Sequence, residues 1–351
     1  MWIDAYDIGP IRPPSEANSL LIRVNRNCPW NRCAFCTVYK GERFERKSVA
    51  EVMGDIDKAA AFFGARAGDI RTAFLQDANA MLMKTPDLVR ILEYLKSKFP
   101  GMERVTTYGR ASTVARKTVQ ELEQLHRAGL SRLHMGLESG SPAMLAFMDK
   151  GTTQAQLIEA GRRVKQAHIS LSYYVMPGLG GMERWQEHAQ ETARVINAVN
   201  PDFIRLRSLS VRRDSPLGHK ALGGEFTAPG DVDMVREIRL MIEHIQGVAS
   251  TLVSDHMLNL LQELEGRFPD DKPALLERCD RFLALPPEEQ EHFTVGARTR
   301  LYYSLSDMDN PALRARVSQM QQSIRHAIDT DPDCAGLDCE GYIRRMMQDV
   351  I

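Results

Sequence analysis

Apolar and polar positions follow two alternating periods through roughly the first 200 residues of the chain. Short apolar runs rich in β-branched residues predict strands, and apolar residues at helical spacing follow each run. The predicted strands are residues 19–24, 71–76, 103–108, 131–137, 169–176 and 202–208. Strict alternation of strands and helices predicts a parallel sheet, in which ligands bind at the carboxyl ends of the strands.

Capping residues mark where the intervening helices begin. The spacing of a capping box occurs at Ser48–Glu51, Thr118–Glu121 and Thr153–Gln156. Thr85 is expected to cap a further helix with Pro86 in its first position. The resulting six βα units fit either a doubly wound sheet or a barrel of TIM type, and periodicity alone does not separate the two.

From about residue 228 onward the strand-like apolar runs end, and only apolar residues at helical spacing remain. Apolar residues recur at this spacing across residues 231–246, 257–265, 273–284, 296–303, 311–327 and 340–349. Prolines separate these segments. We therefore expect a helical C-terminal region over residues 228–351.

One of these helices carries a polar face. It would begin near Ser254 and place His256, Asn259 and Glu263 on one side. That side could touch a substrate, or the segment could be a solvated turn capped by Asp255.

The composition narrows the class of protein. Of 351 residues, 43% are hydrophobic and 26% are charged, which is typical of a globular protein and excludes a collagen-like or wholly disordered chain. Lys and Arg number 45 and Asp and Glu 46, so no global positive field favours nucleic acid as a partner. No apolar run approaches the roughly 18 residues of a membrane span, and the N-terminus lacks the apolar core of a signal peptide. We expect a cytoplasmic protein whose cysteines stay reduced.

Three cysteines lie close together directly after the first predicted strand. Cys28, Cys33 and Cys36 have the spacing C-x4-C-x2-C. Three thiolates can hold three irons of a cubic 4Fe–4S cluster and leave the fourth iron open to a small molecule. The alternatives are unliganded cysteines or a structural zinc site, which requires four ligands where no fourth Cys or His is near. The remaining cysteines, which a second cluster would need, are Cys279, Cys334 and Cys339.

This three-cysteine loop in a βα-repeat chain, with Phe35 just before the third cysteine, resembles the radical S-adenosylmethionine (SAM) superfamily. The usual spacing there is C-x3-C-x2-C, so this chain has one extra residue between its first two cysteines. The resemblance implies an α/β fold, a partial (β/α)6 TIM-type barrel over residues 19–217, after an N-terminal extension of residues 1–18. It also implies one 4Fe–4S cluster held by the three cysteines, SAM, and a reducing partner such as flavodoxin or ferredoxin. The implied reaction is reductive cleavage of SAM to a 5′-deoxyadenosyl radical, which abstracts hydrogen from an unidentified, small-molecule substrate.

The same resemblance assigns site residues beyond the cysteines. Phe35 would lie near the adenine, and Asp77 and Asn79 follow the second strand, where the family binds the amino group of SAM. The segment from Gly136 to Ser141 resembles the Gly-x-Glu-Ser-Gly element of coproporphyrinogen oxidase-like and methylthiotransferase-like members. This element assigns Glu138 as the catalytic candidate near ribose or substrate, with Ser139 beside it. The later motifs assign Gly178 in the turn after the fifth strand. For the SAM carboxylate the candidates are Lys165 and Arg205, and Arg162 and Arg207 are competing cations.

Each assignment has a structural alternative. Asp77 could cap a turn, Glu138 could pair with an arginine, and Lys165 could be solvated. Within the same family, methyl transfer to a small molecule or a non-catalytic cluster or haem carrier is the alternative function. Outside the family, a zinc-stabilised βα protein is the rival.

Overall fold

The computed structural model describes residues 6–334 and 336–348. The chain divides into two compact units. The first holds the residues up to Leu137 together with Leu145–Tyr174 and Ala198–Phe203; the second holds Glu138–Met144, Val175–Asn197 and the residues from Ile204 onward. Residues 1–5 of the expected N-terminal extension and residue 349 of the last expected helix lie outside the described residues.

All six predicted strands are present, and two more join the same sheet. The sheet order is β1-β4-β5-β6-β7-β8-β9-β10. These strands are β1 (Leu20–Arg23), β4 (Thr72–Gln76), β5 (Arg104–Gly109), β6 (Leu130–Glu138), β7 (Ser170–Val175), β8 (Phe203–Leu206), β9 (Thr251–Val253) and β10 (Gly266–Arg267). The pairs β1–β4, β4–β5 and β5–β6 are parallel, whereas β9 and β10 pair antiparallel. The predicted α/β architecture of TIM type with a helical C-terminal region is confirmed; the domain boundaries stay a prediction.

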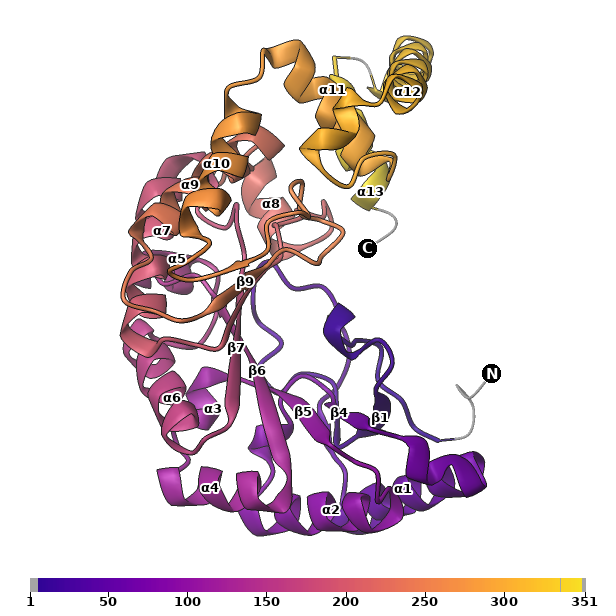
Figure 1. The fold of residues 1–351 in the computed structure, drawn as a ribbon, viewed down its shortest axis with the longest axis vertical. Coiled ribbons are helices and arrows are strands. Elements are labelled where there is room, and N and C mark those ends of the chain that lie inside the picture. Colours follow the sequence, from indigo (N-terminus) through magenta and orange to yellow (C-terminus); the bar gives the residue numbers. More distant parts are fainter. Residues whose placement is uncertain (1–5, 335, 349–351) are drawn as a thin grey trace. The chain divides into compact units, whose positions relative to one another are not determined.

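The helices of the first unit begin where the capping residues indicate. Ser48, Thr118 and Thr153 cap α1 (Val49–Phe63), α4 (Val119–Ala128) and α6 (Gln154–Gln166) with complete capping boxes. The exception is α2 (Thr85–Lys98), which Lys84 precedes as N-cap. The hydroxyl of Thr85 instead donates to Glu121 at 2.9 Å. Helices α1, α2 and α4 lie side by side in this unit (Figure 1).

The two faces of the strands in the first unit differ. Tyr173 of β7 points to the helices, because its hydroxyl donates to the Leu157 carbonyl of α6 at 2.6 Å. Its neighbour Tyr174 therefore points to the other face, since side chains alternate along a strand. There it joins Tyr108 and His134 in an aromatic cluster with ring centroids 5.5–6.4 Å apart.

The N-terminal extension runs along this aromatic face. Glu16 is fully buried, 3.1 Å from Arg104 at the start of β5, and lies 3.8 Å from His134. Farther along, the amide of Gln76 at the end of β4 exchanges hydrogen bonds with the backbone of Gly9. In chain order the extension thus runs from the carboxyl ends of the strands toward their amino ends.

The remaining elements are shorter or belong to the C-terminal half. They are β2 (Asn25–Arg26) and β3 (Glu45–Arg46), which form a small antiparallel sheet, and α3 (Ala111–Val114), α5 (Pro142–Phe147), α7 (Gly181–Val199), α8 (Pro216–Leu222), α9 (Asp231–His244), α10 (Lys272–Leu283), α11 (Pro287–Arg298), α12 (Pro311–Thr330) and α13 (Cys339–Gln348). Short 3-10 turns cover Pro14–Glu16, Gly64–Asp69, Ala80–Leu82, Leu305–Asp309 and Pro332–Cys334. Within the described ranges, no helix has both the length and the apolar character that crossing a membrane requires.

Two predicted C-terminal helices are wrong. Residues 257–265 form turns rather than a helix, and α11 ends at Arg298, so most of the helix expected over 296–303 is absent. The first error has a specific cause: the Asn259 side chain donates to the Leu206 carbonyl at 2.8 Å and accepts from the Ser208 amide at 2.8 Å. These bonds replace the helical hydrogen bonds that local apolar spacing indicated.

Candidate functional site

The three-cysteine loop follows β1 and β2 in the first unit. Cys28, Cys33 and Cys36 are partly exposed, and none forms a disulfide. Asn31 has a left-handed backbone conformation with φ of 47°, which asparagine tolerates better than most residues. Its backbone amide donates to the Cys28 sulfur at 3.5 Å. Such hydrogen bonds stabilise a thiolate and tune the potential of a cluster that it ligates.

The loop docks on the turn of residues 148–151. The Ala34 amide donates to the Met148 carbonyl at 2.9 Å, and the Trp30 indole donates to the Asp149 carbonyl at 2.7 Å. A Cβ atom on Gly151 would lie 2.4 Å from the Trp30 ring, so this turn needs glycine. Phe35, expected near a cofactor, has the Lys150 ammonium 5.5 Å from its ring centroid.

Arg110 is a further residue at this loop, which sequence reasoning did not single out. It directly follows β5, and its guanidinium lies 4.9 Å from the Trp30 ring centroid and donates to the Lys150 carbonyl at 2.7 Å. The pKa of Arg110 is lowered, because partial burial outweighs the opposing effect of the nearby Cys33 and Cys28. A partly buried cation beside these sulfurs favours their thiolate forms. A basic residue immediately after a predicted strand was the available signal.

Asp77, which the sequence proposes as an acceptor for the amino group of SAM, lies against the start of the same loop. Its carboxylate is fully buried, and Oδ2 accepts from Arg23 Nε at 2.8 Å and from the amide of Asn27, the residue before Cys28, at 3.1 Å. Burial raises the pKa of Asp77 despite the Asn27 amide and the Arg23 charge. Asp77 thus holds the start of the cysteine loop at the end of β4.

The second carboxylate oxygen of Asp77, Oδ1, is enclosed by protein. Oδ1 is buried and has no hydrogen-bond partner among the residues that the structure describes. Backbone passes close by, because a Cβ atom on Gly9 would fall 1.7 Å from this oxygen. A buried acceptor without a hydrogen bond raises the free energy of the folded protein. A cationic ligand group that reaches Oδ1 would therefore be stabilised there.

Asn79 lies at the same edge but has its polar atoms engaged. Its Nδ2 donates to Thr113 Oγ1 at 2.9 Å, and its Oδ1 accepts from the Arg110 amide at 3.0 Å. Its carbonyl accepts from the Asn25 side chain at 3.0 Å. Asn79 therefore ties β2 and the ends of β4 and β5 together.

Other candidates of the first unit lie elsewhere. The Lys165 ammonium is 2.5 Å from Asp202, which also accepts the Leu171 amide near the start of β7. This is the amino edge of the sheet, opposite the cysteine loop. Arg162, a competing cation, donates to the Ala198 carbonyl at 3.1 Å.

The second unit has its own polar centre around Glu138 and Gly178. Glu138 has φ of 56°, and its carbonyl accepts from the Met176 amide at 3.0 Å and from His188 at 3.2 Å. The other ring nitrogen of His188 is 2.8 Å from Glu237, which accepts the Gly178 amide at 3.0 Å. Burial lowers the pKa of His188, but Glu237 outweighs it and the net shift is upward.

Sequence reasoning missed both His188 and Glu237. The only signal was a charged or polar side chain within the apolar pattern of each predicted helix.

Ser139, which follows Glu138, is fully buried and accepts the Ser141 amide at 3.0 Å.

The polar residues of 254–263 do not share a face. Asp255 lies 2.6 Å from the largely buried Arg205, so it pairs with a cation instead of capping a helix. Glu263 accepts the Leu305 amide at 2.7 Å, away from the Asn259 bonds described above. Burial and the charge of Arg207 lower the pKa of His256 to about 4. The predicted common face of His256, Asn259 and Glu263 is therefore wrong.

The C-terminal cysteines are buried. Burial raises the pKa of Cys279 to about 12 and, together with Glu291, that of Cys339 to about 11. Cys334 lies 3.2 Å from Asp331. Over residues 6–334 and 336–348, no three His, Cys, Asp or Glu side chains are already grouped around a position for a metal ion.

We compared the chain with protein-family models and with known proteins. The family model described as the radical SAM superfamily matches residues 22–193. A tRNA-2-methylthio-N(6)-dimethylallyladenosine synthase of Nitrosospira multiformis is 29% identical over 201 residues, covering 55% of this chain and 40% of that protein. An uncharacterized methyltransferase of Pyrococcus horikoshii is 24% identical over 211 residues, 58% of this chain and 42% of that protein. The chain therefore spans about two fifths of the length of these relatives.

A solved structure supports the architecture. The cobalamin-dependent S-adenosylmethionine radical enzyme OxsB, with aqua-cobalamin and S-adenosylmethionine bound, aligns with a TM-score of 0.52. The alignment covers 95% of this chain and 58% of that chain at 14% sequence identity. At this identity the similarity shows the fold alone.

Proposed function

Because this chain belongs to the radical SAM superfamily, we propose that it is a radical SAM enzyme whose 4Fe–4S cluster is ligated by Cys28, Cys33 and Cys36. The observation that carries the proposal is that the buried Asp77 carboxylate, at the end of β4, binds the backbone amide of Asn27, the residue directly before Cys28. When bound, the cluster and SAM supply reductive cleavage of SAM to a 5′-deoxyadenosyl radical. The substrate of this chain would be a small molecule, and a flavodoxin or ferredoxin would supply the electron.

The cysteine loop would hold and shield the cluster. Asn31 donates to the Cys28 sulfur, and the Arg110 guanidinium stabilises negative charge on Cys33 and Cys28. Trp30 docks the loop on the turn of residues 148–151 and limits access of water from that side. Phe35 would lie beside the adenine of SAM.

Asp77 would bind the ammonium group of SAM. Arg23 and the Asn27 amide occupy Oδ2, which leaves the buried Oδ1 as the acceptor. Asn79 would act in positioning, because its side chain fixes the Arg110 amide. Lys165 has no comparable support, since Asp202 neutralises it at the other edge of the sheet.

In the second unit we propose Glu138 as the residue that acts on ribose or substrate. His188 and the Met176 amide hold its backbone, so its side chain starts from a fixed position. Ser139 and Gly178 would contribute through backbone and hydroxyl contacts, and Arg205 would meet a carboxylate only by exchanging its Asp255 partner.

The test combines iron content with product formation. Protein purified without oxygen should carry about four irons per chain, and a Cys28→Ala, Cys33→Ala, Cys36→Ala triple variant should lose them. Cys279→Ala is the matched control, because this cysteine is fully buried in α10. With dithionite and SAM, wild type and control should release 5′-deoxyadenosine and the triple variant should not.

Two results would contradict the assignment. Full iron content in the triple variant would exclude the three cysteines as ligands. A SAM-binding, cluster-containing protein that never yields 5′-deoxyadenosine with any supplied metabolite would point to a non-catalytic cluster or haem carrier.

Methyl transfer is the second candidate function, favoured by the names of the two relatives described above. SAM labelled in its methyl group distinguishes it. Label recovered in a small molecule or in added tRNA would support transfer, whereas label retained in methionine would support hydrogen abstraction alone.

A further inference from the structure

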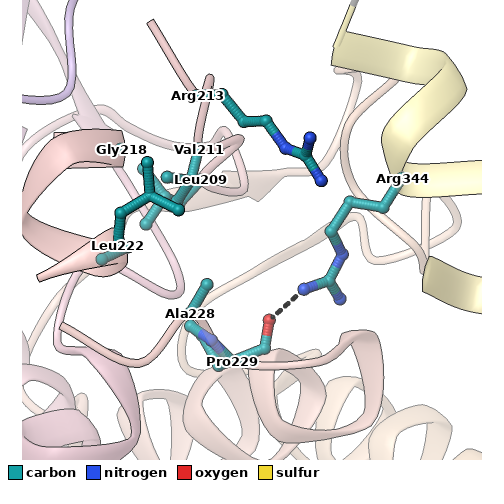
Figure 2. A pocket seen from close by; sticks show the side chains of 9 residues that line it. Leu209, Val211, Arg213, Gly218, Leu222, Ala228, Pro229 and Arg344 are labelled. Carbon is teal, nitrogen blue, oxygen red and sulfur yellow. Dashed lines mark hydrogen bonds between the residues drawn. The ribbon is translucent and has the colours of Figure 1, made fainter. Parts of the chain in front are cut away.

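A pocket of about 250 Å³ lies in the second unit, between the segment after β8, helix α8 and helix α13. Two arginines and a mainly apolar wall line it. The lining residues that the argument uses are Arg213, Arg344, Leu209, Val211 and Leu222. Figure 2 shows the two arginine side chains extending toward one another over the apolar wall. None of these residues belongs to the site proposed for SAM and the cluster.

Arg344 is held in place by bonds that leave donors unused. Its Nη1 donates to the Pro229 carbonyl at 3.0 Å, as the dashed line in Figure 2 marks, and its Nη2 donates to Glu340. A guanidinium has five N–H donors in a fixed plane, so three remain for a ligand. Because the side chain is already ordered, binding costs little further entropy.

Arg213 is exposed, and the local acids are engaged with other cations. Arg212 pairs with Asp214 at 3.1 Å, and Lys220 pairs with Glu225 at 3.6 Å. Among the residues that the structure describes, no carboxylate lies within ion-pair distance of Arg213. Its charge is therefore not neutralised locally.

The backbone that carries Arg213 is fixed by the start of α8. A Cβ atom on Gly218 would lie 2.1 Å from the Arg212 carbonyl oxygen and 2.7 Å from that of Arg213. The Ser215 hydroxyl also donates to the Arg212 carbonyl at 2.6 Å. The close approach that glycine permits keeps Arg213 at the rim of the pocket.

Charge and surface at the pocket indicate one class of ligand. Glu340 offsets the charge of Arg344, so Arg213 leaves about one net positive charge at the mouth. Leu222 is 75% exposed, although it belongs to the apolar wall, so the pocket offers uncovered apolar surface as well. A cation pair over an apolar wall suits a carboxylate or phosphate attached to an apolar body.

We propose that this pocket binds a small organic anion whose carboxylate or phosphate group lies between Arg213 and Arg344. Its apolar body contacts Leu209, Val211 and Leu222. The volume is just below the range of about 300–1,000 Å³ that is typical of ligand pockets, so the ligand is the size of a small metabolite. The proposal does not depend on the radical SAM chemistry proposed above.

Titration calorimetry on the full chain tests the proposal. Phenyl phosphate and benzoate are the anionic probes, benzyl alcohol is the neutral probe, and inorganic phosphate lacks the apolar body. We expect one or both aromatic anions to bind, and to bind more tightly than benzyl alcohol and inorganic phosphate. The tighter of the two aromatic anions identifies the anionic group.

The variants locate the binding. Arg213→Gln and Arg344→Gln should each weaken binding of the aromatic anion by about tenfold or more, the loss expected for a charge-assisted bond. Arg212→Gln is the matched control, because the side chain of this neighbouring arginine pairs with Asp214 and does not line the pocket. Urea unfolding checks that the variants fold. Arg213→Gln is the decisive variant, because replacing Arg213 breaks no ion pair of the folded protein within the described ranges. Absence of binding by both aromatic anions, equal binding of benzyl alcohol, or wild-type affinity in Arg213→Gln would overturn the proposal.

Discussion

Replacing Asp77 with asparagine separates its two proposed roles, holding the cysteine loop and binding SAM. Asparagine keeps an acceptor for Arg23 and the Asn27 amide but removes the charge. Asp77 is fully buried and Arg23 is 12% exposed, so water screens their attraction little. Breaking a buried pair costs about 3–5 kcal/mol when the partner is left uncompensated. Arg23 retains Asp7 at 2.9 Å, and the burial that raises the pKa of Asp77 offsets the attraction between Asp77 and Arg23, so we expect a loss of no more than about 1 kcal/mol in the free energy of unfolding.

The effect on SAM binding should be separate from this loss of stability. A hydrogen bond between charged groups contributes about 1.5–3 kcal/mol, so Asp77→Asn should weaken SAM affinity by about 10- to 150-fold. Arg23→Gln is the matched control, because it breaks the same ion pair but leaves the carboxylate for the ammonium. Urea unfolding should show both variants destabilised, and equilibrium dialysis with SAM should show a large loss in Asp77→Asn only.

The pH dependence supplies a second measure. Burial raises the pKa of Asp77, so its carboxyl takes up a proton at a higher pH than an exposed aspartate. The neutral carboxyl no longer attracts the ammonium, so SAM affinity should fall as pH is lowered through this pKa. The fall should be absent in Asp77→Asn. SAM affinity within twofold of wild type in Asp77→Asn, or an equal loss in Arg23→Gln, would refute the reasoning.

Three further substitutions test the packing and charge described above. Gly151→Ala should force the Trp30 ring away and destabilise the loop by about 1–3 kcal/mol, seen as a lower unfolding midpoint and lower iron content; unchanged iron would contradict the docking. Burial alone would raise the pKa of Glu16, but its partners lower it from 4.5 to about 2, so it contributes up to about 3 kcal/mol that is lost as pH falls from about 4.5 toward 2. Urea unfolding across that range should be less pH-dependent in Glu16→Gln, and parallel curves would argue against it. His188→Gln leaves Glu237 buried beside a neutral partner and should cost about 2–3 kcal/mol at pH 6. Because the pKa of His188 is raised, this difference should be largest below its ordinary value of 6.5 and shrink as pH rises.

Local patterns predicted the parts of the fold that local interactions determine. The six strands of the repeat and the caps at Ser48, Thr118 and Thr153 were read correctly, because each depends on residues within one turn or one strand. The strands β2 and β3 have two residues each, too few for a period to show. The helix expected over residues 257–265 failed because its determining contacts lie about fifty positions away in the sequence, at β8.

The candidate site divides in the same way. The cysteines and Asp77 stand directly after predicted strands, and in parallel sheets such positions gather at one edge. Arg110 and His188 act through partners on other elements, Trp30 for the first and Glu237 for the second. No spacing in one sequence reports such a pairing, so these residues needed the structure.

The extra residue between the first two cysteines is accommodated by structure on both sides of it. Asn31 adopts a left-handed conformation that returns its amide to the Cys28 sulfur, and its side chain donates to the Tyr39 carbonyl. Trp30, the residue before it, donates its indole N–H to the Asp149 carbonyl. Without such bonds, the additional residue between Cys28 and Cys33 would let the loop adopt several conformations and would not fix the positions of the thiols. Here two side chains inside that spacing are bonded to residues outside it, so the departure from C-x3-C is compatible with a fixed arrangement of the three thiols.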